Sequence, residues 1–387
     1  MRIKSIESHV LHSQDTAKEI HDQPNVGGHS GYFVLVHVQT EEGLDGWGEC
    51  ATGSDFGEGA FAAKTIIDRS FRQKLVGKDP REYRKHREGL LSSTDNFGRR
   101  DIGVLALSGV DTALVDITAK DFEVPACLLL GGCYRSEIPL YASLLFDMDD
   151  PSGTAQKGKK YADEHYVGVK YGWGMIPSKP FGKDPKKDEG IVRAIRETLG
   201  KDIGLMIDVG RYVNLSPTKA LHLARSLEKY DITWLEEPLP RDDFDGYSLL
   251  TSQSPVTIAA GENYRGIQDF KRSILHREVD LLQPDVSKAG GLSETKRIID
   301  MAHDFNISWV PHNWSTAINS VATIHLVASA PDGYLMEFKQ EPNPLVHRLV
   351  KHADQLFEVR NGRIHVPTAS GLGIEVDENC VAEFEVT

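Results

Sequence analysis

Three acidic residues at the ends of short apolar segments, repeated at nearly equal intervals, constrain this chain more than any other feature. The segments are IGLMID (203–208), ITWLEE (232–237) and TIAAGE (257–262). The acids Asp208, Glu236 and Glu262 follow one another after 28 and then 26 residues. A strand, a helix and two short loops take about 25 residues, so this spacing predicts successive units of a (β/α)₈ barrel. The acids would then stand side by side at the carboxyl ends of the strands, where barrel enzymes have their active sites.

Three carboxylates at one rim repel one another unless a cation lies between them. A divalent cation is the simplest way to keep all three ionised, and ligation by oxygen alone favours Mg²⁺. The pattern therefore predicts a metal-dependent enzyme, with Mg²⁺ as its cofactor.

The length, composition and charge of the chain limit the classes of protein to which it belongs. A chain of 387 residues exceeds the usual size of one hydrophobic core, so two domains are expected. With 40% apolar and 26% charged residues, the composition excludes disordered, collagenous and coiled-coil proteins. The net charge of −13 and the scattered Lys and Arg residues argue against nucleic acid and anionic membranes as partners.

Targeting signals and cysteine spacing indicate where the protein works. The opening residues MRIKSIESHV contain no long apolar stretch, so no secretion signal is expected. No run approaches the ~18 apolar residues that span a bilayer, so no membrane segment is expected. The four cysteines, at positions 50, 127, 133 and 380, lack zinc-site or CxxC spacing. Free thiols in a reducing cytoplasm are therefore expected.

Three regions of the chain differ in their patterns. Residues 1–125 combine alternating strand patterns with helical ones, which predicts a small α+β domain. Within it, the polar, Gly-rich segment 13–31 is interpreted as a mobile loop. Residues 126–345 alternate strands with helices, and residues 346–387 return to strand-like and turn-rich sequence. The last region is expected to pack back on the N-terminal sheet.

Eight predicted strands alternate with amphipathic helices in the central region. They are 138–144, 165–170, 203–208, 232–237, 257–262, 280–285, 307–312 and 333–338. The fold class is therefore α/β, with parallel strands that close into a barrel.

Four further polar residues lie at the carboxyl ends of these strands. They are Lys170, Asp285, His312 and Glu337. One polar residue at a strand end usually begins a solvated loop, but seven in succession favour an active site.

This set of residues suits the removal of a proton from the carbon next to a carboxylate. The cation would take up the negative charge of the enediolate, and a Lys or His near neutrality would accept the proton. Lys170, beside the cation, is expected to have a lowered pKa. Asp285 lies on the strand next to that of His312 and is placed to orient its ring. Glu337, if it is protonated, can donate a hydrogen bond to the enediolate.

Six segments resemble motifs of the enolase superfamily and, within it, of the mandelate racemase-like group of acid-sugar dehydratases. They are ALVDITAK…LLGG (113–132), MIDVG, WLEEPLP, AAGEN, PDVSKAGG and VPHNWS. The resemblance spans nearly the whole chain. It implies a modified (β/α)₈ TIM barrel with an α+β capping domain, formed by the N-terminal region and the C-terminal tail. It also implies a small-molecule carboxylate substrate and a symmetric homo-oligomer.

The resemblance assigns roles to individual positions. It implies the Mg²⁺ ligands Asp208, Glu236 and Glu262, the dyad His312 and Asp285, the opposite-face acid/base Lys170, the supporting Lys288, and Glu337 as a hydrogen-bonding partner of the intermediate. Glu237 follows a ligand directly and is expected to face away from the metal, because side chains alternate along a strand.

The second strand departs from the pattern of many family members, which carry Lys-x-Lys there. This chain reads GVKYGWG, so the face that Lys170 shares with Gly168 and Gly172 has one lysine. We align Lys170 with the second, proton-moving lysine. If it matches the first instead, that face lacks a lysine base, and Tyr171 is the nearest alternative.

Seven other residues are candidates for substrate contact or for support of the ligands. They are Arg211, Asn263, Asn313, Trp173, Trp314 and, in the polar loop, His21 and His29. Five of them also have a structural interpretation: an ion pair for the arginine, packing for the tryptophans and solvent exposure for the loop histidines.

The leading hypothesis is a Mg²⁺-dependent dehydratase of a sugar acid, an aldonate or aldarate. It would remove the α-proton, eliminate the β-hydroxyl and release a 2-keto-3-deoxy acid. One alternative is a racemase or epimerase of an α-substituted carboxylate, which needs a working base on both faces of the substrate. Another is a non-catalytic, ligand-binding homologue. The identity of the sugar acid does not follow from the sequence.

Overall fold

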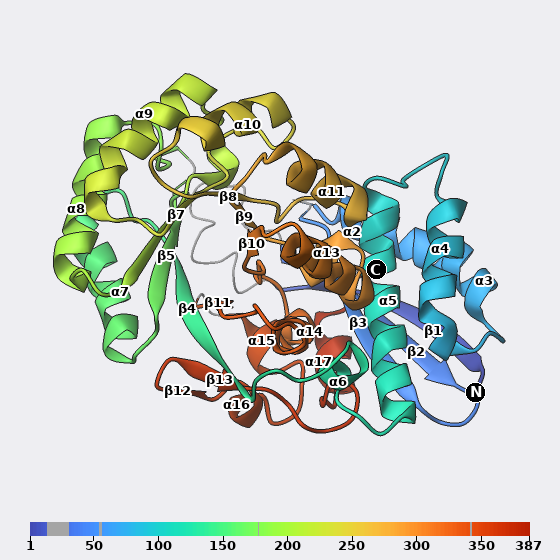
Figure 1. Ribbon diagram of the computed structural model, residues 1–387. Coiled ribbons are helices and arrows are strands. Elements are labelled where there is room, and N and C mark those ends of the chain that lie inside the picture. The colour runs from blue at the N-terminus through green and yellow to red at the C-terminus, as the bar shows by residue number, and fades with distance from the viewer. Residues whose placement is uncertain (14–30, 54–55, 177, 341–342) are drawn as a thin grey trace.

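The computed structural model of the chain describes residues 1–13, 31–53, 56–176, 178–340 and 343–387. A small α+β domain lies beside a larger barrel of alternating strands and helices (Figure 1). This arrangement confirms the predicted fold class, a modified (β/α)₈ barrel with a capping domain. The loop histidines His21 and His29 lie outside the described residues.

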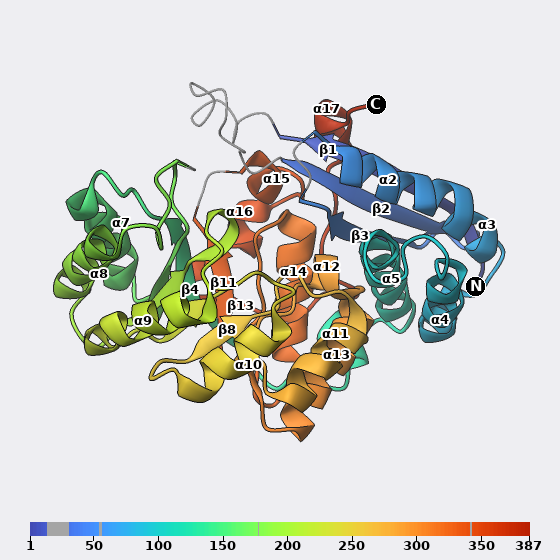
Figure 2. The same cartoon turned by 90° about the horizontal axis from the view of Figure 1, so that it is seen from above.

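The capping domain pairs a three-stranded antiparallel sheet with helices. The strands β1 (Ile3–His12), β2 (Tyr32–Thr40) and β3 (Asp45–Ala51) are adjacent in chain order. The helices are α2 (Glu58–Ile66), the π-helical turn Ile67–Phe71, α3 (Arg72–Leu75), α4 (Tyr83–Ser93) and α5 (Ile102–Asp121). In Figure 2 the sheet and its helices form one flank of the molecule.

Helix α5 is the core helix between the capping sheet and the barrel. All residues from Gly103 to Ala119 are buried. By length and composition, α5 is the one helix within the described ranges that resembles a membrane span, but 94% of its apolar window is buried inside the protein. Ser108, Asp111 and Asp116 interrupt its apolar run, and all three are buried. Burial on all sides explains the high hydropathy of α5.

Strand β3 lies so close to α5 that only glycine fits at position 48. A Cβ atom at Gly48 would lie 1.9 Å from the backbone oxygen of Gly109 in α5. We predict that Gly48→Ala lowers the free energy of unfolding by about 3 kcal/mol, because the backbones must move apart. The exposed Gly89 in α4 has no atom near its Cβ position, so Gly89→Ala is the matched control and should stabilise by about 0.5–1 kcal/mol. Urea denaturation measures both, and equal effects would contradict the proposed close contact.

Within the described residues the barrel has eight strands, and each of them overlaps one predicted strand segment. They are β4 (Glu137–Leu145), β5 (Gly168–Gly172), β6 (Gly204–Asp208), β7 (Trp234–Glu236), β8 (Ile258–Ala260), β9 (Leu281–Leu282), β10 (Ser308–Trp309) and β11 (Met336–Lys339). Parallel pairing runs in order from β4 to β10, and β11 pairs with the other edge of β4. The interior is filled by side chains from several strands, among them Tyr141, Met206 and Trp234.

Helices cover the outside of the barrel. They are α7 (Pro151–Asp163), α8 (Pro185–Leu199), α9 (Pro217–Leu227), α10 (Phe244–Gln253), α11 (Gly266–His276), α12 (Val286–Ala289), α13 (Leu292–Asp304) and α14 (Ala317–Ala328). The Asp-Pro pairs that open α7 and α8 explain where these helices begin. Asp150 and Asp184 accept hydrogen bonds from backbone N–H groups of the first turn, and proline suits the first helical position.

The C-terminal tail contacts both parts of the molecule. Its elements are α15 (Pro344–His347), α16 (Ala353–Leu356), β12 (Val359–Arg360), β13 (Arg363–His365) and α17 (Glu378–Phe384). Strand β13 pairs antiparallel with β4 of the barrel. At the far end of the tail, the Val386 N–H donates to the Val10 carbonyl of β1 at 2.8 Å.

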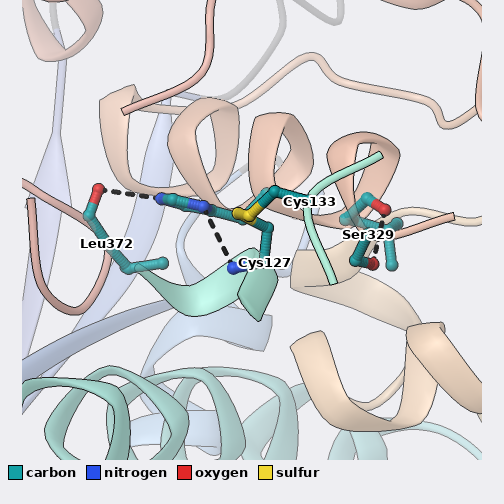
Figure 3. The surroundings of a disulfide bond; sticks show 6 residues. Cys127, Cys133, Ser329 and Leu372 are labelled. Atoms are coloured by element: carbon teal, nitrogen blue, oxygen red, sulfur yellow. Dashed lines mark hydrogen bonds between the residues drawn. A yellow bond between two sulfur atoms is a disulfide. The ribbon is translucent and has the colours of Figure 1, made fainter. Parts of the chain in front are cut away.

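A disulfide joins Cys127 in the short helix α6 (Ala126–Leu129) to Cys133 (Figure 3). The bond lies beside the end of α14, where Ser329 follows the helix. Cys50 and Cys380 are free and buried. The expectation of four free thiols is therefore wrong for one pair. Gly131 and Gly132 lie between the two cysteines with positive φ, and this Gly-Gly pair is the turn signal that the cysteine spacing alone did not provide.

Candidate active site

A cavity of about 480 Å³ opens at the carboxyl ends of the barrel strands. Side chains of the capping domain, including Tyr32 and Phe33, line it from one side, and the ends of the barrel strands line it from the other. Asp208, Lys170 and His312 are among the barrel residues in its wall. Strand ends that are distant in sequence therefore meet in one enclosed space.

Asp208 and Glu236 occupy the same level of neighbouring strands. Their backbones are paired partners in the register of β6 and β7, so both side chains leave the same face. The indole N–H of Trp173 donates to Asp208 at 3.0 Å. Burial and then repulsion by Glu236 raise the pKa of Asp208 well above its usual value. Two buried carboxylates thus lie close together, and Glu236 destabilises the ionised form of Asp208.

Glu236 lies deeper than the cavity wall. It is fully buried, and its carboxylate accepts hydrogen bonds from three side chains. These are Lys170 at 2.7 Å, Trp234 at 2.9 Å and Gln283 at 2.7 Å. Its negative charge is therefore held by the protein's own donors.

Glu262 lies at the cavity wall and contacts two basic side chains. His312 Nε2 is 3.0 Å from one carboxylate oxygen, and Lys288 Nζ is 3.8 Å from the other. The side-chain amide of Asn263 also donates to Glu262, at 2.7 Å. Burial alone would raise the pKa of Glu262, but His312 and Lys288 lower it well below its usual value.

The three acids fit a hard divalent cation in their chemistry, because they offer only oxygen ligands. In the present side-chain conformations, no three His, Cys, Asp or Glu side chains in the described ranges are grouped closely enough to hold an ion. Each of the three is instead hydrogen-bonded to neighbouring donors. Binding of a cation would therefore need these side chains to move closer together, and each carboxylate could keep a hydrogen bond on the lone pairs that the metal does not use.

Glu237 lines the same cavity, which corrects the expectation that it faces away. Its backbone has a φ of 42°, in the left-handed region, and this interrupts the alternation of side chains at the end of β7. Burial and repulsion by Glu262 raise the pKa of Glu237 to about 7. Asn263 donates to it at 3.4 Å. A fourth carboxylate is therefore available beside the predicted ligands.

His312 and Asp285 lie on neighbouring strand ends and form a close pair. The distance from His312 Nδ1 to Asp285 Oδ2 is 2.6 Å. The other oxygen of Asp285 accepts hydrogen bonds from the backbone N–H and the hydroxyl of Ser287, at 2.8 and 2.6 Å. Burial alone would lower the pKa of His312, but Glu262 and Asp285 help to raise it to about 10. The ring is therefore protonated near neutral pH and is suited to give up a proton.

Lys170 contacts two carboxylates; the lowered pKa was expected beside a bound cation and stays a prediction for that state. Its Nζ lies 2.7 Å from Glu236 and 2.9 Å from Glu337. Burial would lower the pKa of Lys170, but these two acids outweigh burial and raise it well above its usual value. Its amine is therefore charged in the structure.

The surroundings of Glu337 lower its pKa, which argues against the suggestion that it is held protonated. Burial raises its pKa, but Lys170 and His312 have the larger combined effect and lower it. One of its oxygens accepts a hydrogen bond from the Asn313 backbone N–H at 2.8 Å. It therefore acts as an acceptor here.

The pairing of β5 with β6 shows at which level of the barrel Lys170, the one lysine of its strand face, lies. Gly172 is paired with Asp208, whereas Lys170 is paired with Met206, one step deeper in the barrel. At the level of the acids, β5 thus has a glycine, and Lys170 lies two residues before it. The match of Lys170 to the second, proton-moving lysine of the family pair stays a prediction. Tyr171 cannot replace a missing lysine, because its hydroxyl donates to the Thr154 carbonyl in α7, outside the barrel.

Of the remaining candidate residues, some line the cavity, one lies buried next to it, and the side chain of one is outside the described part of the structure. Asn263, Lys288 and Trp314 line the cavity, and Asn313 is buried next to it, with its side-chain amide donating to the Glu337 carbonyl at 3.2 Å. Arg211 lies in the short 3₁₀-helix Gly210–Tyr212, and its side chain is outside the described part of the structure.

Other cavity residues were not singled out from the sequence. Lys339, Arg241, Asn214 and Asn343 all line the cavity. Lys339 lies two residues after Glu337 on β11 and therefore shares its face, a signal that strand alternation provides. The others lie in loops, where periodicity gives no information.

Comparison with known proteins adds independent evidence. Residues 17–131 match the family described as mandelate racemase / muconate lactonizing enzyme, N-terminal domain, and residues 154–380 match enolase C-terminal domain-like proteins. The chain is similar to D-galactarolactone cycloisomerase of Agrobacterium fabrum, at 28% identity over 100% of this chain and 99% of that protein. It is also similar to D-xylonate dehydratase of Haloferax volcanii, at 31% identity over 90% of this chain and 84% of that protein.

A solved structure agrees with this comparison over the full length. The 3,6-anhydro-D-galactonate cycloisomerase from Zobellia galactanivorans superimposes with a TM-score of 0.87 at 30% identity, and each chain is covered completely. The similarity therefore includes both the capping domain and the barrel.

Proposed function

Because this chain belongs to the mandelate racemase / muconate lactonizing enzyme family of the enolase superfamily, we propose that it is a Mg²⁺-dependent dehydratase of a sugar acid. It would remove the proton next to the carboxylate and eliminate the β-hydroxyl as water, which leaves an enol that tautomerises to a 2-keto-3-deoxy acid. Curated relatives include dehydratases of xylonate and arabinonate. The observation that carries the proposal is the His312–Asp285 pair in the same cavity as two acids of the predicted ligand set.

In this proposal, His312 protonates the departing hydroxyl. Because the pKa of His312 is about 10, the ring stays protonated until it transfers the proton to the leaving oxygen. Asp285 fixes the ring orientation through Nδ1, so that Nε2 faces the cavity wall at Glu262. The proton leaves Nε2 and bonds to the departing oxygen, and Asp285 stabilises the imidazolium before that transfer.

Lys170 stays the predicted acceptor of the α-proton. Its ionic contacts with Glu236 and Glu337 must loosen before its amine becomes neutral, because both carboxylates favour the charged form. Until then its charge lies at the floor of the cavity, where it favours binding of a substrate carboxylate.

The acids Asp208, Glu236 and Glu262 are the proposed ligands of Mg²⁺. When bound, the ion supplies Lewis-acid stabilisation of the negative charge that grows on the substrate carboxylate. Trp173 and Asn263 would orient the ligands Asp208 and Glu262, since each donates a hydrogen bond to one of them.

Racemisation is less well supported by the contacts of the cavity. A racemase needs a base on each face of the substrate, but Lys170 is held in two ion pairs and Gly172 occupies the level of the acids on β5. Ring-opening elimination is the better second candidate. It would begin with the same α-proton and expel a ring oxygen in place of a hydroxyl, and two of the similar proteins are cycloisomerases.

A substrate screen in D₂O tests these functions together. The purified protein with Mg²⁺ would be incubated with aldonic acids, aldaric acids, their lactones and 3,6-anhydro acids, and ketoacid would be detected with semicarbazide. We expect ketoacid from at least one acyclic acid. Ketoacid from cyclic substrates alone would favour the ring-opening reaction. Deuterium at the α-carbon without ketoacid would indicate racemisation. No product and no exchange across the panel would favour a binding protein and contradict the proposal.

A further inference from the structure

A buried carboxylate of the capping domain reaches the barrel next to the proton-transfer pair. Glu49 lies on β3 and is 2% exposed. Its oxygens accept hydrogen bonds from the Thr316 backbone N–H at 3.2 Å, the Thr316 hydroxyl at 2.6 Å and the Asn319 backbone N–H at 3.0 Å. All three donors belong to the start of α14. Glu49 therefore anchors the first turn of a barrel helix from another domain.

The anchored turn continues to the dyad through one side chain. The amide of Asn319 donates to Asp285 Oδ1 at 3.3 Å and lies 3.3 Å from the Asn313 side-chain oxygen. Asp285 Oδ2 holds His312 Nδ1 at 2.6 Å. A continuous path of hydrogen bonds thus runs from Glu49 through Asn319 and Asp285 to His312, and every residue on it is buried.

We propose that Glu49 is a positioning residue for the His312–Asp285 pair, and that it acts through the first turn of α14 and the amide of Asn319. The proposal deepens the proposed function and rests on it for the role of His312. The oxygen of Asp285 that Asn319 contacts also accepts hydrogen bonds from the backbone N–H and hydroxyl of Ser287 at 2.8 and 2.6 Å, so Asn319 is one of three donors that position this carboxylate. A shift of α14 would therefore move the group that orients the catalytic imidazole.

The burial of Glu49 is costly, which supports a role beyond packing. Burial raises the pKa of Glu49 to about 7, and the nearby charge of Asp285 adds to this. An apolar residue would avoid this cost. Because Glu49 and Asp285 lie near each other, a shift of the local backbone would change the surroundings of both acids.

Asp111 offers a matched control from the same domain. It is 1% exposed, lies on α5, and accepts hydrogen bonds from the backbone N–H and hydroxyl of Ser293 at the start of α13. Within the described residues, its side chain hydrogen-bonds to Ser293 and not to His312 or Asp285. Asp111→Asn therefore removes a buried carboxylate from another helix start and leaves the path to His312 intact.

The kinetic test compares Glu49→Gln with Asp111→Asn in the Mg²⁺-loaded enzyme. We expect Glu49→Gln to lower kcat by about 10–100-fold, as loss of a supporting hydrogen-bond partner does, with KM changed less than threefold. Asp111→Asn should lower the melting temperature without this change in kcat. Equal kcat in Glu49→Gln and Asp111→Asn would overturn the proposal.

A second variant keeps the test decisive if Glu49→Gln does not fold. Asn319→Ala retains the backbone N–H that Glu49 accepts but removes the link to Asp285. It should reproduce the kcat loss, and the double variant should lose no more than either single variant, because both interrupt one path. Unchanged kcat in Asn319→Ala would overturn the proposal.

One measurement does not depend on turnover. The proton between His312 Nδ1 and Asp285 should give a downfield ¹H resonance in protein labelled with ¹⁵N-histidine. At fixed pH, this resonance should shift in Glu49→Gln and Asn319→Ala but stay in place in Asp111→Asn. If the wild-type protein turns over none of the acids but the shifts occur, the positioning role stands and the proposed function fails. An unshifted resonance in Asn319→Ala would contradict the positioning role itself.

Discussion

Replacing His312 by Asn is expected to lower kcat for elimination by about 1000-fold, within the range that general acid catalysis contributes. Asparagine has a similar reach but cannot protonate a departing hydroxyl. The ring of His312 is the group that the structure pairs with Asp285 at 2.6 Å and whose pKa is raised to about 10. The measurement is ketoacid formation at saturating substrate, with Mg²⁺ present.

His325 is the matched control for this substitution. It is fully buried in α14, away from the cavity, where its ring accepts from the Cys127 N–H and donates to the Leu372 carbonyl (Figure 3). Burial lowers its pKa to about 4, so it is neutral. His325→Asn should lower the melting temperature but leave kcat within about threefold, since only distant contacts are lost. Full activity in His312→Asn would refute the assignment of the acid.

Replacing Asp208 by Asn is expected to remove Mg²⁺ binding and to lower activity by about 1000-fold, because metal-ion stabilisation contributes several kcal/mol to the transition state. Isothermal titration with Mg²⁺ measures the binding, and EDTA should abolish wild-type activity until Mg²⁺ is restored. Activity that survives both Asp208→Asn and EDTA would exclude the proposed metal role.

Without metal, Asp208→Asn is expected to leave the stability of the folded protein unchanged or to raise it. Burial and repulsion by Glu236 raise the folded-state pKa of Asp208 above its unfolded value. Ionisation therefore opposes folding at any pH above the unfolded-state pKa, and a neutral Asn removes that cost. In EDTA the variant should melt at or above the wild-type temperature, and Mg²⁺ should no longer raise it.

Asp188 is the control that separates loss of the metal site from relief of a buried charge. It is a buried acid of α8, and burial raises its pKa to about 7. Asp188→Asn should also relieve a buried charge, but its melting temperature should still rise with Mg²⁺, because it lies outside the cavity wall. A lost Mg²⁺ response in both variants would indicate a general effect of buried acids and not a metal site.

Much of the site followed from periodicity alone. Strand ends of a parallel barrel lie at one rim, so the intervals between Asp208, Glu236 and Glu262 placed these acids near one another before any contact was known. The closeness of His312 and Asp285 followed in the same way, because consecutive strands of the repeat are neighbours in space. These inferences need only the chain order and the two-residue alternation of strands.

Other features depended on how distant segments pack. The left-handed backbone of Glu237 turns its side chain into the cavity, against the alternation of a regular strand. The charge state of Lys170 depended on Glu236 and Glu337, which are 66 and 167 residues away in the chain. The disulfide of Cys127 and Cys133 required the chain to turn at Gly131 and Gly132, and the spacing of the cysteines alone did not indicate that pairing.

By itself, the sequence determined the barrel, its order of strands and the residues at the strand ends, because these depend on local periodicity. Only the tertiary structure decided which side chains meet inside the cavity, which of them are charged, and that Glu49 of the capping domain reaches the start of α14. The physical reason is that burial and Coulomb interactions depend on distances in space, and the chain sets those distances only after it has folded.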